Sequence, residues 1–98
     1  RTKIKAEFDA AFEGCDLIAG PTAPTTAFPL GAKNKDVTES YLADVFTVPV
    51  NIIGNPAISV PCGRDKAGLP IGLQLIGKSF GERTLFAAAE ALEKEGCF

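Results

Sequence analysis

The stretch GNPAISVPCGRDKAGLPIGLQLIG, from Gly54 to Gly77, decides the fold of this 98-residue chain. It contains two short apolar runs, at 57–60 and 71–76, whose β-branched residues favour strands. A polar turn at 64–68 separates the two runs. We therefore predict a β-hairpin of two buried strands.

Single residues in and after this stretch carry further predictions. We expect Pro61 to end the first strand, and Gly72 and Gly77 to allow close backbone approach. Ser79 and Glu82 match a capping box, which predicts that a helix begins there. The apolar face of this helix consists of Leu85, Ala88, Ala89 and Leu92.

The residues before the hairpin predict a helix, a strand and a long loop. Residues 1–13 place apolar side chains on one face at helical spacing, and Gly14 is expected to end that helix. The apolar run 16–19 follows as a short strand. Residues 21–37 contain three prolines and a polar turn, so we predict a loop that is either functional or a cover for the sheet edge.

A second helical region is expected between this loop and the hairpin. Thr38 can cap a helix that runs to Phe46. Pro49 cannot lie inside that helix, so we predict a break at Thr47, which would cap a new short helix over 48–53. The element order is that of an α/β fold in which helices pack on a mixed sheet.

Asp44 is the residue in this region whose chemistry suggests a ligand. It lies among apolar residues, about one turn before the predicted break. Its carboxylate could bind the ammonium group of a ligand through a charge-assisted hydrogen bond. The alternative is that it lies on the solvent face of an amphipathic helix. Ser59, inside an apolar strand, is predicted to be a hydrogen-bonded core hydroxyl.

The composition excludes several kinds of site. The chain contains no histidine, which excludes Ser-His-Asp and Cys-His sites and the common zinc enzyme sites within these residues. Glycine-rich phosphate-binding motifs are absent. The net charge of −2 does not favour direct nucleic-acid binding, and no apolar run is long enough to span a membrane. Cys15, Cys62 and Cys97 match no metal pattern, and we expect buried, reduced thiols.

Three runs of the sequence resemble the C-terminal part of the amidase signature family. They are DLIAGPTAPTTAF (16–28), YLADVFTVPVNIIGNPAISVPCG (41–63) and GLPIGLQLIGKSFGERTLFAAAEALE (68–93). Within the family they are most similar to the A subunits of bacterial aspartyl/glutamyl-tRNA amidotransferases. The resemblance implies an α/β/α sandwich around a mixed sheet. Residues 1–98 would form a single C-terminal segment, about the last fifth of a longer protein.

The resemblance also implies a chemistry. Members hydrolyse amides with a Ser–cis-Ser–Lys triad in a Gly/Ser-rich sequence that no position here matches. We therefore assign no catalytic residue and no metal site to this chain, and expect the isolated chain to be inactive. Asp44, in the motif Y-L-x-D, is similar in position to the carboxylate that holds the α-amino group of the substrate glutamine.

The resemblance further implies partners. The A subunit would release ammonia from glutamine, and a B subunit would use ATP and Mg²⁺ to activate the misacylated glutamyl or aspartyl group on tRNA. A small C subunit would wrap around both, and tRNA would be contacted through the complex rather than by this segment. The expected setting is the bacterial cytoplasm or an organellar matrix, without a membrane.

Two alternative functions remain open from the sequence. The chain could belong to a stand-alone amidase for other small amides, although such an enzyme would have no need of Asp44 to bind an ammonium group. It could also be a non-catalytic interaction module. For the isolated chain we expect either self-association through an unpaired sheet edge or marginal stability.

Overall fold

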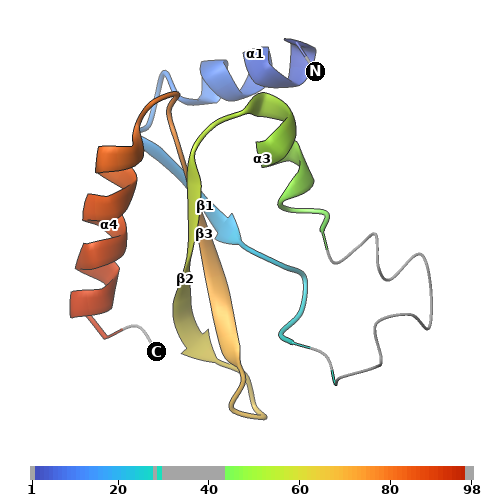
Figure 1. Ribbon diagram of the computed structural model, residues 1–98, viewed down its shortest axis with the longest axis vertical. Coiled ribbons are helices and arrows are strands. Elements are labelled where there is room, and N and C mark those ends of the chain that lie inside the picture. Colours follow the sequence, from blue (N-terminus) through green and yellow to red (C-terminus); the bar gives the residue numbers. More distant parts are fainter. Residues whose placement is uncertain (1, 28, 30–43, 97–98) are drawn as a thin grey trace.

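The computed structural model describes residues 2–27, 29 and 44–96 (Figure 1). In chain order its elements are α1 (Thr2–Ala11), β1 (Leu17–Pro21), α3 (Val48–Ile53), β2 (Ala57–Arg64), β3 (Pro70–Gly77) and α4 (Glu82–Lys94). Most of the predicted helix from Thr38 to Phe46 lies outside the described residues. Its described part, from Asp44 onward, is a turn that leads into α3.

The three described strands form one antiparallel sheet in the order β1-β3-β2. The predicted pairing of the hairpin is confirmed, because β2 pairs with β3 and Ile58 lies opposite Leu75. The prediction that both strands are buried is wrong for β2, where Ala57 and Ser59 are exposed and Val60 is buried. On the other side of β3, Ile18 of β1 pairs with Ile76. The predicted α/β class is thus confirmed, and this antiparallel sheet is the part of it that the described residues form.

The predicted end of the first hairpin strand at Pro61 is wrong. β2 continues to Arg64, with an irregularity in the register between Pro61 and Arg64. In the three-stranded sheet β2 is an edge strand, and a proline at an edge can leave its missing donor on the unpaired side. Gly63, with φ of 93°, lies within the irregularity.

The predicted capping box at the start of α4 is also wrong. Gly81 occupies the N-cap position, and no side chain caps the helix. The Ser79 hydroxyl instead accepts a hydrogen bond of 2.8 Å from Lys5 Nζ on α1. The Ser79 side chain, which the local pattern assigned to the helix end, is therefore hydrogen-bonded to a residue distant in the sequence.

Helices lie on both sides of the sheet, with α4 along one side and α1 and α3 near one end of the other (Figure 1). Leu85 and Ala89 on α4 are buried, as are Val60 and Leu75, which share the facing side of the strands. The opposite core contains Phe12, Val50, Ile53 and Ile76, with Ile4, Phe8 and Ile18 packed against it. The apolar face predicted for residues 1–13 is confirmed by this packing.

Gly77 lies where the sheet meets α4, and its closest neighbour is a side chain rather than backbone. A Cβ added there would lie 3.1 Å from Leu85 Cγ. The prediction of buried thiols is wrong for Cys15, which is exposed, whereas Cys62 is half-buried and Cys97 lies outside the described residues.

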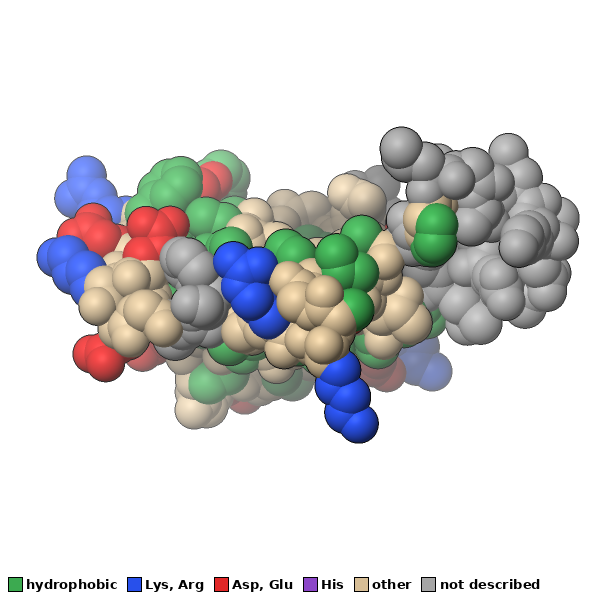
Figure 2. Space-filling model, turned by 90° about the horizontal axis from the view of Figure 1, so that it is seen from below, with side chains coloured by type: hydrophobic (Ala, Val, Ile, Leu, Met, Phe, Trp, Pro, Cys, Tyr) green, Lys and Arg blue, Asp and Glu red, His purple; other side chains and the backbone are tan. Residues whose placement is uncertain are grey.

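None of the helices in the described ranges is both long and apolar enough to cross a membrane. On the face shown in Figure 2, Lys and Arg side chains are scattered among polar and hydrophobic ones rather than gathered in a continuous patch.

Candidate functional site

Asp44 begins a turn, over residues 44–47, that leads directly into α3. Its backbone carbonyl accepts hydrogen bonds from the backbone N–H groups of Thr47 (3.1 Å) and Val48 (3.0 Å). The Thr47 hydroxyl donates to the same carbonyl over 3.3 Å. Asp44 itself is exposed. The backbone of this residue is therefore fixed against the start of α3, while the residue remains accessible.

The predicted start of a short helix after Thr47 is confirmed, whereas the helix from which it was expected to be separated lies largely outside the described residues. Thr47 occupies the N-cap position of α3, yet its hydroxyl makes no capping bond to the helix. Pro49 lies in the first turn of α3, where its missing N–H is tolerated. Gly54 ends the helix in the left-handed region, with φ of 75°.

The turn is joined to the sheet by Gln74. This side chain is 7% exposed, and its Nε2 donates a hydrogen bond of 3.0 Å to the backbone carbonyl of Phe46. Sequence reasoning missed Gln74. The available signal was a carboxamide inside the otherwise apolar strand PIGLQLIG.

The sheet is polar next to Gln74. Gln74 is paired with Gly20 on β1 and with Ser59 on β2, so the three positions share one face. The hydroxyl oxygens of Ser59 and Thr22 lie 2.6 Å apart. Ser59 is exposed, so its hydroxyl is hydrogen-bonded as predicted but is not in the core.

Gly72 lies directly against this pair of hydroxyls. A Cβ at Gly72 would lie 2.9 Å from Thr22 Oγ1 and 3.1 Å from Ser59 Oγ. The prediction of close backbone approach at Gly72 is wrong, because the atoms that approach it closely belong to the side chains of Thr22 and Ser59.

Asp65 organises the hairpin turn at the far end of β2 and β3. Its carboxylate accepts hydrogen bonds from Thr26 Oγ1 (2.6 Å) and from the N–H groups of Ala67 and Leu69 (2.9 Å each). The Thr26 hydroxyl, followed by these backbone donors, holds the pKa of Asp65 below its ordinary value of 3.8. The bond from Thr26 also ties the loop after β1 to the hairpin.

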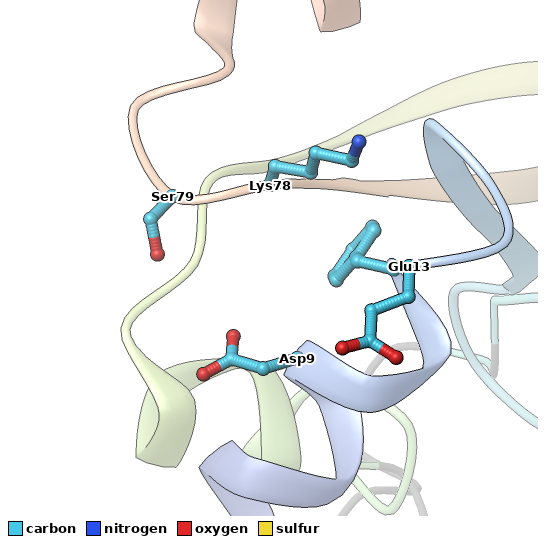
Figure 3. Close-up of a pocket in the computed structure, with 5 residues that line it drawn as sticks. Asp9, Glu13, Lys78 and Ser79 are labelled. Carbon is cyan, nitrogen blue, oxygen red and sulfur yellow. The ribbon is translucent and has the colours of Figure 1, made fainter.

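An open depression of about 380 Å³ lies between α1 and the segment after β3. Figure 3 shows Asp9 of α1 and Glu13, which follows the end of that helix, facing Lys78 and Ser79 across it. Asp9 pairs with Lys5 at 3.5 Å, and Lys78 pairs with the exposed Asp16 at 3.6 Å. These ion pairs involve most of the charged side chains that line the depression, so we assign no ligand to the depression. In the described part of the chain, no cluster of His, Cys, Asp or Glu could hold a metal ion.

The sequence model of the Amidase family matches residues 1–86. The chain belongs to the amidase family. It is 55% identical over 96 residues to the A subunit of glutamyl-tRNA(Gln) amidotransferase from Anaeromyxobacter sp. strain K, a match that covers 97% of this chain. The A subunit numbered 2 of the same amidotransferase from Clostridium acetobutylicum is also 55% identical, over 95 residues and 97% of this chain.

Two solved structures have a similar fold. The structure of the glutamyl-tRNA(Gln) amidotransferase A subunit from Thermotoga maritima matches with a TM-score of 0.81 and 44% identity, over 87% of this chain and 18% of that one. A 6-aminohexanoate cyclic dimer hydrolase matches with a TM-score of 0.74 and 28% identity, over 95% of this chain and 22% of that one. This amidase-family chain spans about a fifth of the length of the curated relatives it matches, 20% for both proteins named above.

Proposed function

We propose that this chain forms part of the A subunit of a glutamine-dependent tRNA amidotransferase, in which Asp44 holds the α-ammonium group of glutamine. The observation that carries the proposal is the 55% identity, over 96 residues, to a protein of that name. The turn supports the role, because Asp44 is exposed while its backbone is fixed by three donors.

The chemistry of the ligand fits a carboxylate at this position. Free glutamine carries a positive charge on its α-amino group, and a carboxylate accepts hydrogen bonds from it that are stronger than bonds between neutral groups. Such a contact selects a free amino acid over an uncharged amide. Water is the second reactant: the C–N bond of the side-chain amide is broken, a C–O bond to the water oxygen is formed, and the products are glutamate and ammonia. The Ser–cis-Ser–Lys triad for this step would come from other residues of the complete protein.

The partners follow from the same assignment. A B subunit would use ATP and Mg²⁺ to activate the glutamyl or aspartyl group on misacylated tRNA, and a C subunit would complete the complex. The ammonia released from glutamine would convert that group to its amide. The tRNA would contact the complex chiefly through the B subunit, and the complex would act in the bacterial cytoplasm or an organellar matrix.

A second candidate function is hydrolysis of small amides by a stand-alone enzyme. The structural match to a 6-aminohexanoate cyclic dimer hydrolase favours this alternative. Its 28% identity is lower than the 44% identity to the Thermotoga maritima protein, and for that reason we place the amidotransferase first.

The test is the Asp44→Asn substitution in the complete enzyme. Asparagine keeps the shape of the side chain and removes its charge, so we expect the KM for glutamine to rise about tenfold or more, since a hydrogen bond to a charged group contributes roughly 1.5–3 kcal/mol. The measurement is ammonia released as a function of glutamine concentration. Glutaramate, which lacks the α-ammonium group, should show no such difference between the two proteins.

Asp16→Asn is the matched control. Asp16 is an exposed carboxylate whose recorded partner is Lys78, and its loss should leave the KM unchanged. A normal KM in Asp44→Asn would contradict the role of Asp44 and favour a different amide substrate.

A further inference from the structure

We propose that Gln74 is a positioning residue that holds the turn at 44–47 in place, and through it the carboxylate of Asp44. This role rests on the proposed function and deepens it. The structural basis is the hydrogen bond of 3.0 Å from Gln74 Nε2 to the backbone carbonyl of Phe46, two residues after Asp44.

The buried position of Gln74 restricts the orientation of its side chain. The side chain is 7% exposed, and a buried carboxamide without a partner is costly. A backbone carbonyl can only accept, so the NH₂ group of Gln74 must face Phe46. The side chain therefore has one favourable orientation, and that orientation fixes the position of the Phe46 carbonyl over the sheet.

The turn is held at two points. The Asp44 carbonyl joins it to the start of α3, and α3 is seated in the core by Val50 and Ile53. The Gln74 bond joins it to β3, in the centre of the sheet. Losing the second point would leave the turn free to pivot about the start of α3.

Side-chain packing offers little replacement for that bond. Val45 is 44% exposed, Phe46 is 39% exposed and Val48 is 46% exposed. These side chains are far from fully buried within this chain. The hydrogen bond from Gln74 is therefore the contact that sets the distance between the turn and the sheet. A displacement of about 1 Å at a binding group is enough to weaken recognition substantially.

The decisive experiment is a double-mutant cycle in the complete enzyme. Gln74→Met keeps the length of the side chain and removes the donor. We expect it to raise the KM for glutamine about tenfold, with little change in kcat and no change for glutaramate. In the Asp44→Asn background the same substitution should raise the KM for glutamine by less than about a further twofold. The reason is that the effects of two substitutions are not additive when one residue acts through the other.

Asn55→Leu separates positioning from a general loss of stability. Asn55 is also 7% exposed, and its Nδ2 also donates to a backbone carbonyl, that of Gly77, over 2.9 Å. Thermal unfolding should show that Asn55→Leu and Gln74→Met are both destabilised. Only Gln74→Met should raise the KM.

Gln74→Glu provides a second variant if Gln74→Met fails to fold. An ionised carboxylate cannot donate to Phe46, whereas a protonated carboxyl can. The ratio of its KM to that of the wild-type protein should therefore decrease as the pH falls. A ratio that stays constant with pH would contradict the role of the donor.

The outcomes separate the two proposals. If Asp44→Asn leaves the KM unchanged, the proposed function fails, and the positioning role fails with it. A different outcome is that Asp44→Asn raises the KM, but Gln74→Met raises the KM by the same factor in the wild-type and the Asp44→Asn proteins. The proposed function then stands, and the positioning role of Gln74 is overturned.

Discussion

The two faces of the sheet differ in how far their apolar character extends. The face toward α4 is apolar along its length, with Val60 and Leu75 beneath Leu85 and Ala89. The face toward α1 and α3 is apolar around Ile76 but becomes polar at Gln74. The hydroxyls of Thr22 and Ser59 and the turn that carries Asp44 belong to this second part.

This difference separates two kinds of energetic contribution. Burial of apolar surface is non-directional, so the α4 face should affect stability without affecting ligand recognition. Hydrogen bonds at the polar end depend on distance and angle, so small displacements there should matter for both. Substitutions on the two faces can test whether stability and recognition separate in this way.

The largest effect is expected on the apolar face, from Leu85→Ala. Leu85 is 3% exposed, and truncation of such a side chain costs about 2–5 kcal/mol of stability. Denaturant unfolding of the complete enzyme measures this loss, while the KM for glutamine should stay unchanged. Phe86→Ala is the control, because Phe86 is the next residue but is 64% exposed and should contribute far less. Equal losses in the two variants would show that α4 does not pack on the sheet as described.

A smaller effect is expected at the polar end, from Gly72→Ala. The new Cβ would lie 2.9 Å from Thr22 Oγ1 and 3.1 Å from Ser59 Oγ, so the hydroxyl pair must separate, at a cost of roughly 1–3 kcal/mol. Thermal unfolding of the complete enzyme measures the effect. Gly20→Ala is the matched control on the same face, because its Cβ would meet nothing within 4 Å. A Gly72→Ala protein as stable as Gly20→Ala would contradict the close approach.

The smallest effect is expected at the hairpin turn, where Asp65 is hydrogen-bonded to Thr26. The pKa of Asp65 is lower in the folded protein than its ordinary value of 3.8, so the ionised form is favoured by folding. Its stabilising contribution is therefore complete above pH 3.8 and is lost as the pH falls through the lowered pKa. Unfolding measured from neutral to acidic pH should show Asp65→Asn less stable than the wild-type protein at neutral pH. The difference in stability between the two proteins should become smaller at acidic pH. A difference in stability that does not depend on pH would show that the Asp65 carboxylate is not its cause.

Local patterns predicted the elements well where neighbours in the sequence determine the structure. The pairing of the hairpin and the short helix that starts after Thr47 and ends at Gly54 follow from backbone preferences of single residues. The errors have tertiary causes. Pro61 is tolerated because β2 is an edge strand, and Ser79 binds Lys5 rather than the end of α4. Neither the position of a strand in the sheet nor a distant lysine is visible in a local pattern.

The sequence by itself determined the α/β class and the family, and it marked Asp44 as a candidate ligand-binding residue. Strand and helix periodicity and the motif Y-L-x-D are properties of consecutive residues, so they can be recognised without the structure. Only the tertiary structure decided that Gln74 lies beneath the turn that carries Asp44. Alternation along β3 predicts which residues share a face with Gln74, but not which segment covers that face. That segment is brought there by the packing of α3 against α1 and the sheet, through contacts between residues far apart in the chain.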